Sequence, residues 1–127
     1  MSQVPQHTVT LLHLHEDDHG DTHFGTRDIA LALRDFAPPA APFDVSDAQP
    51  ASQFVMIRLP VGWIGEPHAS PRPQMLFCLS GRLKITCSSG ETAIIEAGAG
   101  LAMSDVNGRG HKTEVVSTEP VSAIIIQ

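Results

Sequence analysis

The feature that most constrains the fold of this chain is a series of short apolar segments after residue 53. Turn-forming Gly, Ser and Pro residues separate each segment from the next, and no helical pattern intervenes. We predict strands at residues 54–59, 75–79, 83–87, 92–96, 101–103, 113–116 and 121–126. Many short strands at close intervals indicate an all-β sandwich or closed barrel.

The first 53 residues have a different pattern. Residues 8–16 and 24–36 alternate apolar and polar side chains, which predicts two further strands, the first at the edge of a sheet. Residues 37–51 contain four prolines, which favour an irregular connecting arm because proline has no backbone N–H for a ladder. We therefore predict one domain over residues 1–127, with N-terminal strands and a Pro-rich arm at 1–53 and the barrel core at 54–127.

Composition excludes several functional classes. The formal net charge is −6 with only 8 Lys plus Arg, so the chain lacks the cationic excess that binds nucleic acid or anionic lipid. The N-terminus shows neither the basic start nor the apolar stretch of a signal peptide or membrane span, so we expect a cytoplasmic protein. In a reducing compartment Cys78 and Cys87 are expected to be free thiols.

One segment has the spacing of a known motif. Residues 62–81 read GWIGEPHASPRPQMLFCLSG, in which Gly62, His68, Gln74 and Gly81 stand at fixed intervals. This spacing resembles the first conserved motif of the cupin superfamily, in which Gly, two His, Glu and Gly occupy the corresponding places. Ser70 stands here at the place of the second His, and Gln74 at the place of the Glu.

A later segment resembles the second cupin motif. Gly98 and His111 match its Gly and its terminal His, while Ser104 and Val106 replace its usual Pro and Gly, and Val115 stands at its final Asn. The chain is thus similar to small bacterial cupins of the RmlC-like superfamily whose activity is not defined. The resemblance implies a double-stranded β-helix, or jelly-roll, barrel with an N-terminal arm, and a site at the barrel mouth.

The same residues indicate what kind of metal site this chain can offer. A divalent first-row metal needs three or four converging imidazole or carboxylate ligands. The sequence offers His68 and His111 with Gln74 as a weak third ligand, and Ser70 and Gln74 are neutral. Either Glu66 supplies a carboxylate, or a metal such as Zn, Ni, Fe or Mn is held loosely or is absent.

Four residues near these histidines are candidates for binding a substrate. Arg72 could clamp an acidic group with two hydrogen bonds, or be an ordinary solvated surface arginine. Trp63 could form a wall of the pocket or plug the core, the second being favoured. Ser70 and Glu66 complete the set of candidates.

Two functions remain open at this stage. The first is a binding protein that holds a small polar or acidic molecule at the barrel mouth, and the second is a metal-dependent dioxygenase or isomerase that uses His68 and His111. The apolar run 121–126 needs a covering sheet or partner, which favours a homodimer. A separate cluster, His13, His15, His19 and His23, is interpreted as solvent-facing.

Overall fold

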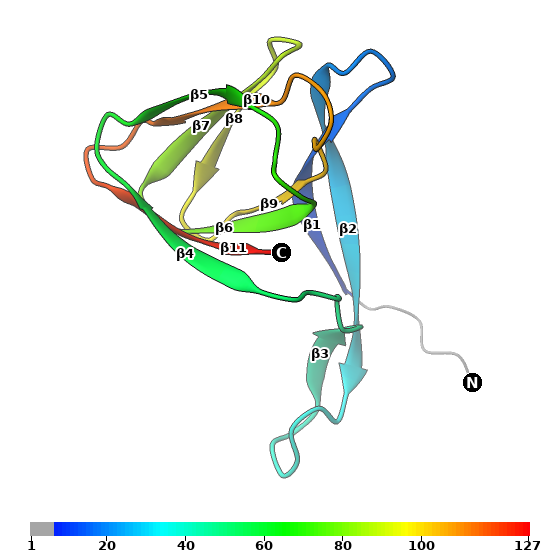
Figure 1. Ribbon diagram of the computed structural model, residues 1–127. Coiled ribbons are helices and arrows are strands. Elements are labelled where there is room, and N and C mark those ends of the chain that lie inside the picture. Colours follow the sequence, from blue (N-terminus) through cyan, green and yellow to red (C-terminus); the bar gives the residue numbers. More distant parts are fainter. Residues whose placement is uncertain (1–6) are drawn as a thin grey trace.

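The computed structural model describes residues 7–127, which form eleven strands and no helix (Figure 1). The expected absence of a targeting signal depends on the start of the chain, and that segment lies outside the described residues. No helix of the described chain is long and apolar enough to cross a membrane. The strands are β1 (His7–Glu16), β2 (Thr22–Arg34), β3 (Phe43–Ser46), β4 (Phe54–Leu59), β5 (Ile64–His68), β6 (Gln74–Ser80), β7 (Arg82–Cys87), β8 (Thr92–Glu96), β9 (Gly100–Met103), β10 (His111–Val115) and β11 (Val121–Ile126).

Two sheets pack face to face as a jelly roll. The larger sheet has the order β3-β2-β1-β9-β6-β11-β4 and the smaller one β5-β10-β7-β8, and only the β1–β9 pair is parallel. Alternation along each strand directs one face inward, so that Leu83 and Ile85 of β7 meet Leu76 of β6 and Leu101 of β9 in one core. The predicted all-β jelly-roll architecture is confirmed.

All nine predicted strands are present, with ends shifted by up to two residues. Two strands were missed. Strand β5 contains Pro67 and Gly65 and shows no apolar alternation, and β3 is a four-residue strand inside the Pro-rich arm, where it pairs with β2. The interpretation of residues 37–51 as wholly irregular is therefore wrong.

The prediction of β1 as an edge strand is also wrong. It pairs with β2 on one side and β9 on the other, and Leu14 is fully buried in the core. Glycines at positions 81 and 98 favour tight turns that close hairpins, but each of these turns leads from one sheet to the other. Cys78 and Cys87, predicted to be free thiols, lie in different sheets, and both are free and buried.

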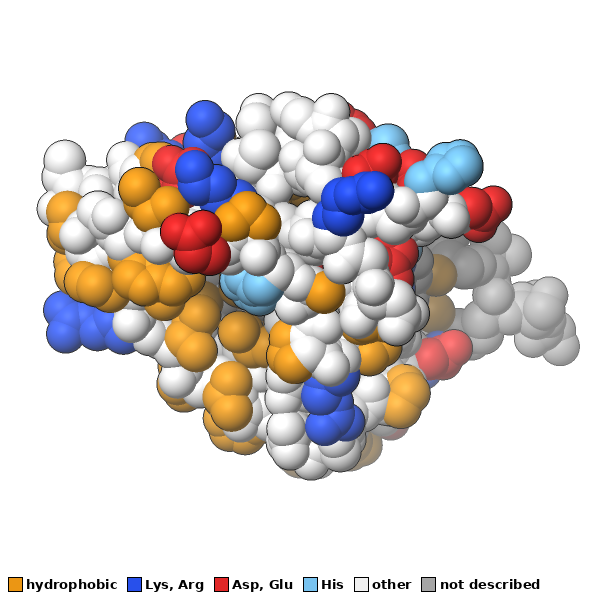
Figure 2. Space-filling view, turned by 45° about the horizontal axis from the view of Figure 1, so that its top comes forward, with side chains coloured by type: hydrophobic (Ala, Val, Ile, Leu, Met, Phe, Trp, Pro, Cys, Tyr) orange, Lys and Arg blue, Asp and Glu red, His pale blue; other side chains and the backbone are white. Residues whose placement is uncertain are grey.

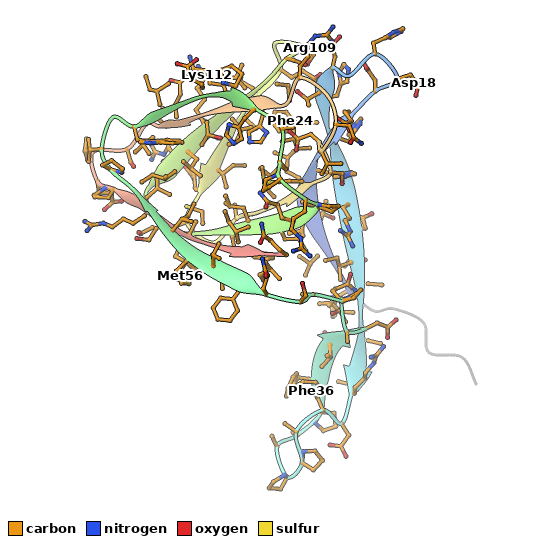
Figure 3. The ribbon with its side chains drawn as sticks, in the orientation of Figure 1. Asp18, Phe24, Phe36, Met56, Arg109 and Lys112 are labelled. Carbon is orange, nitrogen blue, oxygen red and sulfur yellow. The ribbon has the colours of Figure 1, made fainter. Side chains whose placement is uncertain are left out.

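The end of β2 and all of β3 form an arm that extends away from the barrel (Figure 1). Its tip carries Phe36 and Phe43, whose rings contact edge to face with centroids 5.7 Å apart. Both side chains are exposed, and Phe36 is labelled on the arm in Figure 3.

Candidate functional site

The structure brings His68 and His111 together at one end of the barrel. His68 is the last residue of β5, His111 the first of β10, and the two are direct partners in the antiparallel ladder. Partners in a ladder present their side chains on the same face of the sheet. The two imidazole rings accordingly lie with centroids 5.0 Å apart. We call this pair the mouth histidines.

A buried carboxylate holds His111. Asp105 Oδ2 lies 2.6 Å from His111 Nδ1, and the side chains are 0% and 3% exposed. The second carboxylate oxygen, Oδ1, accepts a hydrogen bond of 2.8 Å from Ser70 Oγ, and the Ser70 backbone N–H donates to the Asp105 carbonyl. The Ser70 hydroxyl therefore holds the carboxylate that orients His111. Sequence analysis missed Asp105.

These contacts fix the tautomers of both mouth histidines. A carbonyl oxygen or a carboxylate can only accept a hydrogen bond, so His68 Nδ1 donates to the Glu66 carbonyl (2.8 Å) and His111 Nδ1 donates to Asp105. In each neutral ring the lone pair is then on Nε2. No buried side-chain N or O atom of the described chain lacks a hydrogen-bond partner, so the unbonded Nε2 of His111 reaches solvent beside His68.

The loop that carries Asp105 is held by the connection between β1 and β2. Glu16 Oε2 accepts a 2.6 Å hydrogen bond from Gly108 N–H, and Arg109 Nη1 donates to the His19 carbonyl and to Asp21. Figure 3 labels Arg109 to the left of this connection, and Asp18 on the connection itself. These hydrogen bonds fix the loop in the position that places Asp105 beside His111.

Close packing also determines where the loop meets β5. Gly110 has φ +74°, a left-handed conformation, and a Cβ there would overlap the His68 carbonyl group. Glycine at position 110 therefore allows β10 to begin directly against the end of β5. This contact sets the distance between the mouth histidines.

The side chains of the other candidate residues make their contacts elsewhere and not with the mouth histidines. Gln74 donates to Met103 Sδ (3.6 Å) and accepts from Gln127 Nε2 (2.9 Å). Arg72 is exposed and donates to Ser52 Oγ at 3.3 Å, while Trp63 is half-buried and packs against the core.

Glu66 is exposed, and its backbone carbonyl is the group that contacts His68. The observed hydrogen bonds therefore join the mouth histidines to Asp105 and Ser70 and do not join them to Gln74.

A second group of imidazoles and carboxylates lies at the β1–β2 connection. His23 Nδ1 is 2.7 Å from Glu91 and Nε2 is 2.7 Å from Asp17, and these two hydrogen bonds raise the pKa of His23. The hydrogen bond from His23 is the largest cause that lowers the pKa of Asp17 to about 2. We call His23, Asp17 and Glu91 the outer histidine cluster.

The neighbouring His13 and His15 lie on β1 with ring centroids 5.4 Å apart. His13 is half-buried and its Nε2 lies 2.8 Å from Ser104 Oγ, so its side chain is not simply solvent-facing as expected. Burial, followed by the charges of His15 and Arg27, lowers the pKa of His13.

The described fold has known structural relatives. No family model matches the sequence, and no curated protein matches it. The cupin domain of Schizosaccharomyces pombe Cnp3 superposes with a TM-score of 0.51 at 12% identity, over 94% of this chain and 81% of that one. The chain has a cupin fold.

Two further cupin-fold neighbours are more distant. A Cupin 2 conserved barrel domain protein from Leptotrichia buccalis gives a TM-score of 0.48 at 20% identity, over 63% of this chain and 36% of that one. A putative ethanolamine utilization protein Q from Salmonella typhimurium gives 0.48 at 14% identity, over 94% and 95%. This chain thus spans about a third of the Leptotrichia protein.

The cupin fold often carries a metal at the barrel mouth, which requires free ligand atoms there. The Asp105 carboxylate is engaged by His111 and Ser70, and the Gln74 amide by Met103 and Gln127. Within residues 7–127 no group of three or more His, Cys, Asp or Glu side chains is arranged to hold a metal ion. The Nε2 atoms of His68 and His111 remain as ligands for a metal, which is fewer than the three or four ligands that a resident metal needs. The residues of this cupin do not fit one.

Proposed function

We propose that this cupin binds a small polar or acidic molecule at the barrel mouth through His68 and His111, without a resident metal. One observation carries the proposal: both rings use Nδ1 for a structural hydrogen bond, which leaves Nε2 of each without a partner among the described residues, and the ring centroids are 5.0 Å apart. A buried carboxylate that the Ser70 hydroxyl holds in place against one imidazole ring is expected where that ring has to meet a ligand in a fixed geometry.

The chemistry of the ligand follows from the two nitrogens. A neutral Nε2 accepts a hydrogen bond from a hydroxyl or amine, and a ring that gains a proton donates to a carboxylate. At this end of the molecule, charged side chains of both signs intermix on the surface (Figure 2). These features support a small hydroxylated or acidic ligand.

Ligand-induced stabilisation tests the proposal. Thermal unfolding is measured in EDTA with malate, citrate and glucose on the wild-type chain, on the His68→Ala/His111→Ala variant, and on His19→Ala as an exposed-histidine control. A ligand at a hundred times its Kd stabilises the native state by about 2.7 kcal/mol. We expect stabilisation of the wild type and the control but not of the double variant. Equal stabilisation of all three would refute the site.

Metal content tests the alternative, a metal-dependent cupin enzyme. In metal sites, a carboxylate commonly accepts a hydrogen bond from the second ring nitrogen of a metal-bound histidine and so orients it. The Asp105–His111 hydrogen bond has this form, and it is the observation that favours a metal-dependent enzyme. Protein purified without chelator is assayed for Zn, Ni, Fe and Mn beside the double variant. Near-stoichiometric metal in the wild type alone would establish the alternative, and we expect substoichiometric metal in both.

We also propose that a second copy of the chain pairs with strand β4. β11, whose apolar run suggested a partner, lies between β6 and β4 and is already covered at both edges. β4 is one of the two edge strands of the large sheet, the other being β3, and its Phe54, Val55 and Met56 are 64%, 43% and 58% exposed. Met56 points away from the barrel in Figure 3. A free apolar edge favours isologous strand pairing.

Light scattering tests this pairing of β4 strands. We expect the wild-type chain to be a dimer and the Phe54→Ser/Met56→Ser variant to be a monomer. A monomeric wild type would refute the proposed dimer.

A further inference from the structure

A groove of about 370 Å³ lies away from the mouth histidines. It is bounded by β2, the start of β6, the end of β11 and the segment that returns from the arm to β4 (Figure 1). Met75 and Phe77 line it, and these residues alternate along β6 with Leu76 and Cys78 of the core. The groove is therefore mainly on the outer face of the large sheet, and neither His68 nor His111 reaches it.

The charge of the groove differs from that of the chain. The chain carries a formal net charge of −6, yet Arg27 is the only charged side chain among the described residues that line the groove. The Arg27 guanidinium makes one hydrogen bond, 3.2 Å from Nη2 to Gln49 Oε1, and no Asp or Glu of the described residues forms a salt bridge with it. Its remaining donors are available to a ligand.

The rest of the lining is apolar or already hydrogen-bonded. Ile29, Phe77 and Ile126 form an apolar wall next to Arg27. Beyond these side chains, Gln127 Nε2 donates a hydrogen bond to Gln74 Oε1, so these two amide groups are already engaged with each other. An apolar cleft with a few fixed polar groups is the usual form of a small-molecule site, and this volume lies at the lower end of the roughly 300–1,000 Å³ range.

We propose that this groove binds a medium-chain aliphatic carboxylate, with the carboxylate on Arg27 and the chain along Ile29, Phe77 and Ile126. Arginine can hold a carboxylate with two parallel hydrogen bonds, which fixes the head group. Burial of the aliphatic chain supplies the affinity. Among the residues that the structure describes, no carboxylate lines the groove to repel the anion. This site is independent of the mouth histidines.

Octanoate is the probe, used on the full-length chain with binding followed by calorimetry and by NMR shifts of side-chain methyl groups. We expect saturable binding with shifts at Ile29, Met75 and Ile126. Arg27→Gln should weaken binding by about tenfold or more, and the neutral analogue octanamide should bind the wild type correspondingly less tightly. The matched control is Arg58→Gln, an exposed arginine on β4 outside this groove, which should bind octanoate as the wild type does.

Several outcomes would overturn the proposal. These are no saturable binding of octanoate by the wild type at about 1 mM, equal binding by Arg27→Gln, equal binding of octanamide, or shifts confined to other surfaces. If a second copy of the chain occupied the groove, octanoate binding would weaken as the protein concentration rises. That result would also contradict the proposal. The His68→Ala/His111→Ala variant should bind octanoate normally, so failure at the mouth and failure at the groove remain distinguishable.

Discussion

Two of the histidines that contact carboxylates, His111 and His23, lie in opposite environments. His111 is 3% exposed and has one carboxylate partner, Asp105, which is itself fully buried. His23 is 34% exposed and lies between two carboxylates, Asp17 and Glu91. The first pair positions an imidazole at the barrel mouth, while the second joins the β1–β2 connection to residue 91, just before β8.

The difference shows how burial changes the role of one interaction. In the interior, removing one partner leaves an uncompensated polar or charged group, so the pair is costly to break. At the surface, water replaces a lost partner and salt screens the charges, so the same hydrogen bonds contribute little. The mouth pair is therefore expected to affect stability strongly, and the outer histidine cluster to affect mainly how stability depends on pH.

The largest expected effect is that of Asp105→Ala. This variant removes the partner of His111 and of the Ser70 hydroxyl, so the free energy of unfolding should fall by about 3–5 kcal/mol, the usual cost of breaking a buried pair. Urea unfolding measures it, with Asp17→Ala as the exposed counterpart. The comparison between buried and exposed pairs fails if the two variants lose equal stability.

Gly110→Ala is expected to come next. It is compared with Gly90→Ala, because both glycines have positive φ but nothing lies within 4 Å of a Cβ at position 90. The left-handed conformation costs about 1–2 kcal/mol in either variant, and overlap with the His68 carbonyl should add at least about 1 kcal/mol at Gly110. Chemical denaturation of both variants checks this, and equal losses would show that the loop does not press against β5.

The smallest effect is the pH dependence that the outer histidine cluster produces. The pKa of His23 is raised, so its contribution is complete below the unfolded value of 6.5 and disappears as pH rises through the folded pKa. The pKa of Asp17 is lowered to about 2 from 3.8, so its contribution is complete above 3.8 and is lost as pH falls.

The difference in unfolding free energy between wild type and His23→Gln should therefore be largest near pH 5–6 and decline toward pH 8. Unfolding at pH 5.5, 6.5 and 8 measures it. A difference that stays constant across that range would contradict the assignment. His7→Gln, which changes an exposed histidine beside Asp44, is a control for surface charge.

The strands were predictable because apolar residues alternate with polar ones along most of them and Gly and Pro mark their ends. Where that signal is absent, prediction failed: β5 reads Ile-Gly-Glu-Pro-His, and its place in the sheet depends on pairing with β10. The central position of β1 also depends on a parallel partner 89 residues away, Leu12 with Leu101, which local pattern does not reveal.

The candidate site was predictable only in part. Motif spacing selected His68 and His111, which the structure brings together. It selected Gln74 by position as well, yet that amide is hydrogen-bonded to Gln127, the residue that follows β11, a contact that spacing cannot show. Asp105 was missed because it reads as an ordinary loop residue. The available signal was a carboxylate six residues before His111, in a loop with two glycines.

The tautomeric state of the mouth histidines tests the central claim most directly. Long-range ¹H–¹⁵N correlation spectra of the full-length chain, assigned with the His68→Ala and His111→Ala variants, report which ring nitrogen carries the proton. The structure predicts that both neutral rings are protonated at Nδ1, with Nε2 free to meet a ligand. A proton on Nε2 of neutral His111 would mean that Asp105 does not hold the ring as described, and would contradict the proposed site.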